Sequence, residues 1–196
     1  MWAAGLPVAN APWSNGGHVV LWQVSSDNEL MSSIDLCQFE GAGALGHAVN
    51  TLGIVAGTVW SAAGEEGFLW SDTQDLETFP FAAATLGMND QNSVVGQWFG
   101  RAAIWAGGVL EAIGPEGSVA REISNDGLVV GDLTLGGADG AKGFGFVLID
   151  GEIHLLEGLS GIDHSRARAV NSSGFVVGES YIPDVAVSDD AVWIAN

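Results

Sequence analysis

The sequence predicts an all-β fold, a β-propeller-like array of about five units with up to four short antiparallel strands each. Three observations lead to this prediction. A segment that reads as strand, turn and strand recurs at a period of about 40 residues. The apolar runs between its copies are short and end at turn-forming residues such as Gly, Asp and Ser. The chain contains 29 glycines, and no stretch of it shows convincing helical periodicity.

The recurring segment has the chemistry of a β-hairpin. The second residue of each copy is Asn or Ser, whose side chain can bond to nearby backbone and start a turn. The fifth residue is glycine in three copies and Asn92 in the other, and both residue types tolerate a positive φ. Aliphatic residues, mostly β-branched, then begin a second strand that closes on a glycine. The copies occupy residues 49–57, 88–96, 123–131 and 170–178.

Further elements complete each unit. After the hairpin and a short apolar run comes a third element, in which one apolar residue lies three positions before another, as at Leu76 and Phe79. A fourth leads back to the hairpin through a small residue, at Gly46, Thr85, Ala120 and Ala167. The second element is a short apolar run, usually ending in Trp, that is expected to be a buried strand. These runs are Val20–Trp22, Phe68–Trp70, Ala103–Trp105, Phe146–Leu148 and Ala191–Trp193.

The chain as a whole, residues 1–196, is expected to be a single repeat domain. A β-solenoid is the alternative architecture, although solenoid coils normally repeat on a shorter period. About 18 strands are expected, which leaves the first and last units without all their partners. One blade is then incomplete, the chain is a piece of a longer array, or a second chain completes it through the unpaired terminal strands. The units are expected at approximately 1–34, 35–73, 74–108, 109–151 and 152–196.

Composition excludes several classes of partner. The chain has 24 Asp and Glu against 5 Lys and Arg, a net charge of −19, and no basic stripe that could neutralise phosphates. Nucleic acid and anionic membrane surfaces are therefore not expected partners. No apolar stretch approaches the roughly 20 residues of a membrane-spanning helix, so membrane insertion is not expected either. The single cysteine, Cys37, excludes an intramolecular disulfide.

Parts of the repeat resemble a known family. The segments Ser118–Gly131, Ser165–Gly178 and Gly17–Trp22 are similar to the HAF repeat, a bacterial repeat named for a Gly-His-Ala-Phe-Leu-Trp-like strand. The resemblance runs from about Gly17 to Trp193. It implies propeller-like β repeats and a location outside the cell or at its surface, although no signal peptide is visible in this chain. The histidine of the family pattern survives only as His18; its place is taken by Glu66, Arg101, Phe144 and Asp189.

Residues that could carry catalysis or bind a metal are scattered. The four histidines show no metal-ligand spacing, so no metal site is expected from them. Asp163, His164 and Ser165 are the residue types of a catalytic triad, but neighbours on a strand point to opposite faces. No catalytic residue is therefore assigned. Calcium is the cofactor that acidic turns could admit, and the candidate turns are 89–92, 125–126 and 189–190, although Asn and Asp also suit turns for backbone reasons alone.

Aromatic residues divide into two groups. Trp22, Trp70, Trp105 and Trp193 occupy the repeated strand position and are expected in the core. Trp60, Trp98 and Tyr181 instead follow the closing glycine of their hairpins by two or three residues, with Trp13 in the equivalent loop of the first unit. Because equivalent loops of neighbouring blades lie on one rim, these four side chains are the candidate ligand-binding residues.

The resulting hypothesis is a non-catalytic binding or interaction module at or outside the cell surface, recognising carbohydrate or protein. One alternative is a polysaccharide-acting hydrolase, whose carboxylates would come from separate blades and would show raised pKa values in a pocket. The other alternative is a structural unit of a longer repeat array or filament.

Overall fold

The fold is described from a computed structural model, in which residues 2–5, 18–36, 43–61, 64–73, 76–80, 85–136, 141–183 and 188–194 are placed. Every regular element in these ranges is a strand, and none of them is a helix with the length and hydropathy of a membrane span. The described strands form five small antiparallel sheets. The all-β prediction is confirmed.

Each sheet contains strands that are consecutive in the chain. Sheet 1 consists of β1 (Trp2–Gly5), β2 (Val20–Val24) and β3 (Leu30–Asp35). Sheet 2 consists of β4 (Gly43–Val49), β5 (Val55–Ser61), β6 (Gly64–Trp70) and β7 (Glu77–Phe79). Sheet 3 consists of β8 (Thr85–Met88), β9 (Val94–Trp98), β10 (Arg101–Ala106) and β11 (Val109–Glu116). Sheet 4 consists of β12 (Ser118–Ile123), β13 (Val129–Leu135), β14 (Lys142–Ile149) and β15 (Glu152–Leu156). Sheet 5 consists of β16 (His164–Val170), β17 (Phe175–Tyr181) and β18 (Ser188–Ile194).

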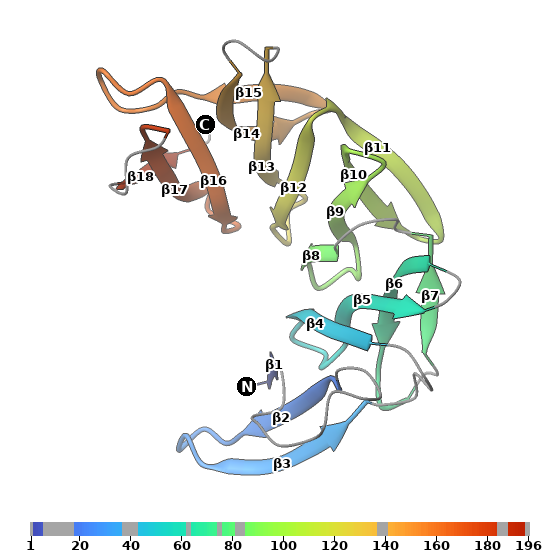
Figure 1. The fold of residues 1–196 in the computed structure, drawn as a ribbon. Coiled ribbons are helices and arrows are strands. Elements are labelled where there is room, and N and C mark those ends of the chain that lie inside the picture. Colours follow the sequence, from blue (N-terminus) through green and yellow to red (C-terminus); the bar gives the residue numbers. More distant parts are fainter. Residues whose placement is uncertain are drawn as a thin grey trace.

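The sheets follow one another around an arc (Figure 1). The first strands of sheets 2 to 5, β4, β8, β12 and β16, lie along the inner side of the arc, and β3, β7, β11 and β15 lie along its outer side. Sheets 1 and 5 stand on either side of the opening (Figure 1). The three described strands of sheet 1 correspond to the second, third and fourth strands of a four-stranded sheet. The three described strands of sheet 5 correspond to the first, second and third.

Sheets 2 to 4 each end one strand later than the unit boundaries expected from the sequence. The turns Gly107–Gly108 and Asp150–Gly151 have positive φ at both residues, which is the geometry of a tight hairpin. These turns return the chain directly alongside the preceding strand, so β11 pairs with β10 and β15 pairs with β14. The third element is therefore the last strand of its own sheet and begins as early as Glu152, ahead of the apolar residues that marked it.

The recurring segment forms the hairpins β4–β5, β8–β9, β12–β13 and β16–β17, as predicted. The second residue of the segment holds each turn through its side-chain oxygen. Asn89 Oδ1 accepts the backbone N–H groups of Gln91 (3.1 Å) and Ser93 (3.0 Å). Asn50 and Asn171 make the same pair of bonds, and Ser124 makes one of them. The fifth residue has a positive φ in every copy: Gly53 (79°), Asn92 (61°), Gly127 (86°) and Gly174 (77°).

The closing glycine lies where two backbones meet. Gly57 pairs with Gly46 on β4 and with Phe68 on β6, and the register of β4 shifts by a β-bulge beside it. A Cβ on Gly57 would overlap the Leu45 carbonyl oxygen and the ring of Phe68. Gly131 and Gly178 are enclosed in the same way by the backbone of the preceding strand. The small residue of the fourth element is thus the partner of the closing glycine, and both make room for the bulge.

Among the described residues, buried apolar side chains form four clusters, each lying between two consecutive sheets. Trp70 belongs to the cluster between sheets 1 and 2, and Trp105 belongs to the next one, where it stacks on Phe79 with ring centroids 4.6 Å apart. Both tryptophans are buried, as predicted, whereas Trp22 is half-buried. Trp193 lies in β18, whose side chains are outside the described residues.

Buried hydroxyl groups join neighbouring sheets. Ser118 at the start of sheet 4 accepts the Ala102 N–H (2.8 Å) and donates to the Pro115 carbonyl, both in sheet 3. Ser165 at the start of sheet 5 accepts the Gly145 N–H (2.9 Å) and donates to the Leu156 carbonyl, both in sheet 4. Each serine satisfies polar backbone groups that the interface would otherwise bury without a partner.

The turn glycine provides a test of the backbone argument. A Cβ on Gly127 would meet no atom within 4 Å, so only its positive φ opposes substitution. We expect Gly127→Val to lower the free energy of unfolding by about 1–3 kcal/mol and Gly127→Asn to change it little, because Asn92 already occupies the matching site. Urea denaturation of the two variants measures the difference. Equal losses for Val and Asn would contradict the assignment.

Candidate functional site

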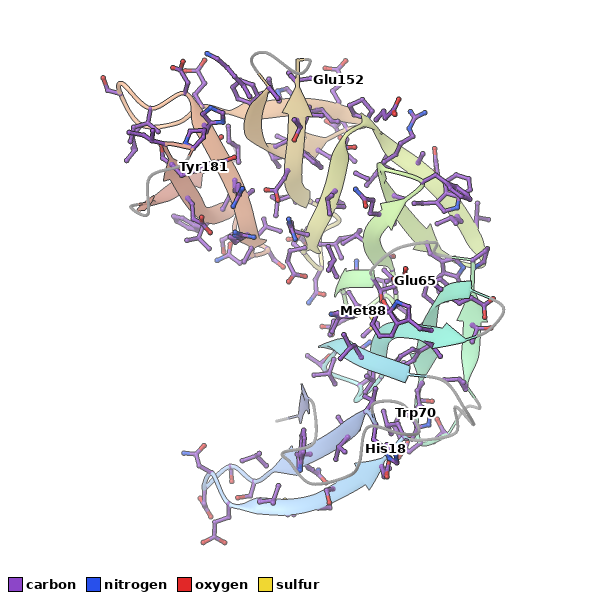
Figure 2. All side chains as sticks on the ribbon, viewed as in Figure 1. His18, Glu65, Trp70, Met88, Glu152 and Tyr181 are labelled. Atoms are coloured by element: carbon purple, nitrogen blue, oxygen red, sulfur yellow. The ribbon has the colours of Figure 1, made fainter. Side chains whose placement is uncertain are left out.

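The three expected binding residues that the structure describes lie on three different sheets. Trp13 lies outside the described residues. Trp60 is near the end of β5, Trp98 ends β9 and Tyr181 ends β17, so they belong to sheets 2, 3 and 5. Figure 2 places Tyr181 on sheet 5, far from Trp70 and Met88 of sheets 2 and 3. In the intervening sheet 4, the position equivalent to Tyr181 is Thr134, which has no ring.

Trp60 and Trp98 point in different directions. Trp60 is three residues past its closing glycine and is 39% exposed, whereas Trp98 is two residues past its own. Successive residues of a strand face opposite sides of the sheet. Trp98 therefore takes the position of Val59 and Leu133, which are buried, and it packs against the cluster between sheets 2 and 3. The true counterpart of Trp60 in sheet 3 is Phe99, which is 75% exposed and contacts the Trp98 ring.

Because Trp60 and Trp98 lie on opposite faces of their strands, we expect their substitutions to differ in their effect on stability. We expect Trp98→Ala to lower the free energy of unfolding by about 2 kcal/mol or more, because it leaves a gap beside the cluster of Trp105 and Phe79. Trp60→Ala is the matched control and should lower it by about 1 kcal/mol or less. Thermal melting of both variants measures the contrast; a Trp98→Ala protein as stable as Trp60→Ala would show that the Trp98 ring adds nothing to the core.

Tyr181 lines a pocket between sheets 4 and 5. The pocket has a volume of about 430 Å³, and its wall includes Thr134, Gly143, His164 and Arg166. The guanidinium of Arg166 lies 4.3 Å from the centre of the Tyr181 ring, and the His164 ring lies 5.3 Å from it. The pocket is at the loop end of β13 and β17, the rim on which the sequence placed ligand binding.

Backbone hydrogen bonds fix the polar wall of this pocket. The Gly143 N–H donates to His164 Nδ1 (3.0 Å), so this nitrogen is an acceptor and a neutral ring carries its proton on Nε2. A Cβ on Gly143 would overlap the Tyr181 hydroxyl group, so the tyrosine ring could keep this position only beside a glycine and would otherwise have to shift. The rings of His164 and Tyr181 are thus held against the start of β14.

Arg166 differs from the other cations near the pocket. Lys142 pairs with Asp163 (2.6 Å), which lowers the pKa of that carboxyl group chiefly through their hydrogen bond. Arg168 pairs with Glu179 (2.8 Å), and Arg121 in sheet 4 pairs with Asp132 (2.7 Å). Arg166 has no carboxylate partner among the described residues; its recorded contact is the face of the Tyr181 ring. Among the described residues no group accepts a hydrogen bond from this guanidinium, so its N–H donors are available to a ligand.

Sequence reasoning singled out Tyr181 as a candidate but not Arg166 or His164, which line the same pocket. A signal for them existed. His164, Arg166 and Arg168 are spaced by two along one strand, so they project on the same side as Tyr181 of the paired strand, and they include two of the five Lys and Arg residues in the chain. The intervening residues, Ser165 and Ala167, are fully buried.

Two of the turns considered for calcium, 89–92 and 125–126, are linked to one another. Asp90 Oδ1 accepts the Thr51 N–H (2.9 Å), and Asp90 Oδ2 accepts from Asn125 Nδ2 (2.8 Å). Asn125 Oδ1 in turn accepts the Asp90 N–H (2.9 Å). The carboxylate therefore joins the turns of sheets 2, 3 and 4. Asp189 and Asp190 lie in β18, whose side chains are not described, and among the described residues no three His, Cys, Asp or Glu side chains lie close together.

The Asp90 bonds predict a pH dependence. The Thr51 N–H, followed by Asn125, holds the Asp90 pKa below its usual value of 3.8, so the charged form stabilises the fold. We expect Asp90→Asn to lower the melting temperature at pH 7. That deficit should shrink as the pH falls below about 4 and vanish below the folded pKa, where Asp90 itself is protonated. Asp126→Asn is the control, because Asp126 is the residue after Asn125 in the turn of sheet 4. A deficit independent of pH would contradict the carboxylate's role.

Other features are weaker candidates. A pocket of about 200 Å³ lies between sheets 2 and 3 and includes Trp70, Trp105 and Asn92 in its wall. Burial raises the pKa of the Glu122 carboxyl group, which is a property of catalytic acids, but Glu122 lines none of the pockets described here. It accepts the Ile123 N–H (3.1 Å) instead.

Comparisons of the chain with protein-family models, curated proteins and solved structures find no match. The resemblance to the HAF repeat therefore stays a prediction from the residues.

Proposed function

We propose that this chain is a non-catalytic binding module on a propeller-like scaffold, and that its ligand is a carbohydrate bearing a carboxylate. The single observation that carries the proposal is the state of Arg166: it is held over the Tyr181 ring in a pocket and has no carboxylate partner among the described residues. Action at or outside the cell surface is part of the proposal and is based on the HAF resemblance alone.

The pocket supplies complementary groups for such a ligand. The Arg166 guanidinium can hold a carboxylate through two parallel N–H bonds. Hydroxyl groups of a sugar can bond to the imidazole of His164 and the side chain of Thr134, both of which line the pocket. The volume of about 430 Å³ falls within the range of roughly 300–1,000 Å³ that is usual for small-ligand sites.

The net charge of −19 does not exclude an anionic ligand here. At physiological ionic strength, charges beyond about 8 Å are largely screened, so the groups around the pocket dominate. The carboxylates of Asp163 and Glu179 near it are already paired with Lys142 and Arg168. The local field at Arg166 is thus less negative than the composition of the chain indicates.

Calorimetric titration with oligogalacturonate tests this proposal. The purified chain should bind it and should bind the neutral oligosaccharide of the same length more weakly. Arg166→Gln should weaken binding by about 10- to 100-fold, the worth of one charge-assisted hydrogen-bonded contact of about 1.5–3 kcal/mol. Arg168→Gln is the matched control, because Arg168 is on the same strand but bonded to Glu179.

Two results would contradict the proposal. One is equal binding by Arg166→Gln and Arg168→Gln, which would place the ligand elsewhere. The other is binding of an acidic peptide but not of any acidic oligosaccharide, which would make a protein the partner.

A further inference from the structure

The interfaces between consecutive sheets follow one rule. The residue directly before the closing glycine of each hairpin faces the following sheet. These residues are Ala56 of sheet 2, Val95 of sheet 3 and Val130 of sheet 4, and they are 1%, 0% and 0% exposed. Each belongs to the cluster shared with the next sheet. The following sheet contributes residues of its third strand to the same cluster, such as Ala103 and Trp105 of sheet 3. We call the side of a sheet that packs on the following sheet its forward face, and the side that packs on the preceding sheet its backward face; the described side chains of sheets 2 to 4 follow this arrangement.

The forward face of sheet 5 is open. Val177 occupies the same hairpin position as Val130, yet it is 43% exposed, and Phe175 two residues before it is 48% exposed. Val176, which points to sheet 4, is fully buried. The exposure is thus confined to the side of β17 that a following sheet would cover.

The backward face of sheet 1 is its counterpart. Val19 and Leu21 are buried in the cluster with sheet 2, so Val20 and Trp22, which alternate with them, face away from sheet 2. The residues equivalent to Val20 in the next three sheets, Phe68, Ala103 and Phe146, are fully buried, whereas Val20 itself is only half-buried. Sheet 1 and sheet 5 stand on either side of the opening of the arc (Figure 1).

We propose that the forward face of sheet 5 binds the backward face of sheet 1 on a second copy of this chain. The contact continues the internal interface: Val177 and Phe175 of one copy pack against Val20 and Trp22 of the next. Because the two faces differ, the contact is heterologous and extends the array as a chain of copies, unless the rotation closes it into a ring. The structural unit of a longer array, one of the functions considered from the sequence, is what such a contact would produce.

The pocket of Tyr181 and Arg166 is on the same side of sheet 5 as Val177, but at the loop end of β17. In sheets 2 and 3, which are each followed by another sheet, the positions equivalent to Tyr181 are Trp60 and Phe99, and both are exposed. A sheet docked over Val177 would therefore leave the rim of sheet 5 accessible. Failure of either proposal leaves the other standing.

The net charge predicts how the association of two copies depends on salt concentration. Each copy carries a net charge of −19, so approach of a second copy is opposed by long-range repulsion. Salt screens this repulsion, while burial of apolar side chains persists. We expect association to strengthen from low salt to about 0.5 M NaCl, where the Debye length is only a few ångströms.

Analytical ultracentrifugation over a range of concentrations tests the proposal. The weight-average mass of the wild-type chain should rise above that of the monomer with concentration and with salt. Val177→Asp should remain monomeric. Val109→Asp is the matched control: Val109 is 65% exposed in sheet 3 and is remote from both faces, so this variant should associate as the wild type does. Circular dichroism confirms that each variant is folded.

A mixing experiment distinguishes this contact from a symmetric one. Trp22→Asp, or Val20→Asp if the first does not fold, should also be monomeric alone, because it lacks the backward face. Mixed with Val177→Asp, it should form a dimer and nothing larger, since the pair retains one intact face of each kind. A wild-type chain that stays monomeric at all salt concentrations would overturn the proposal, as would a Trp22→Asp variant that dimerises by itself.

Discussion

The fold depends on one constraint: a sheet of three or four short strands buries its apolar side chains only against the sheet beside it. All four core clusters lie between consecutive sheets. Stability is then a sum of neighbouring contacts, as in other repeat proteins. The bulge and closing glycine, the Asn-held turns and the Ser118 and Ser165 bridges serve this stacking, because they bring the first strand of each sheet close to the preceding one.

Local features of the fold could be predicted because backbone chemistry determines them. The positive φ at Gly127 and at Asn92 follows from residue type and turn position. The pairing of Ala120 with Gly131 could be seen only as two small residues at fixed offsets, since nothing in one sequence shows which backbones meet. The extent of the third element was not predictable from apolar spacing, because the tight turn at Asp150 and Gly151 starts β15 before those residues.

The candidate site was predicted less well, for a geometric reason. A shift of one residue along a strand reverses the face, and that shift separates Trp98, packed in the core, from Trp60, which is exposed. The pocket of Tyr181 is assembled from Thr134, Gly143 and Arg166 on two sheets, and no linear motif joins them. What makes Arg166 a candidate is the pairing of the other cations near it, which only the structure reveals.

Native-state hydrogen exchange tests the central claim that each sheet is stabilised by its neighbours. At a concentration where the chain is monomeric, amides of β9, β10, β13 and β14, in sheets with a neighbour on both sides, should exchange most slowly. Those of β2 and β17, in sheets with one neighbour, should exchange faster. Equal protection in all five sheets, or the slowest exchange in sheet 5, would contradict the account.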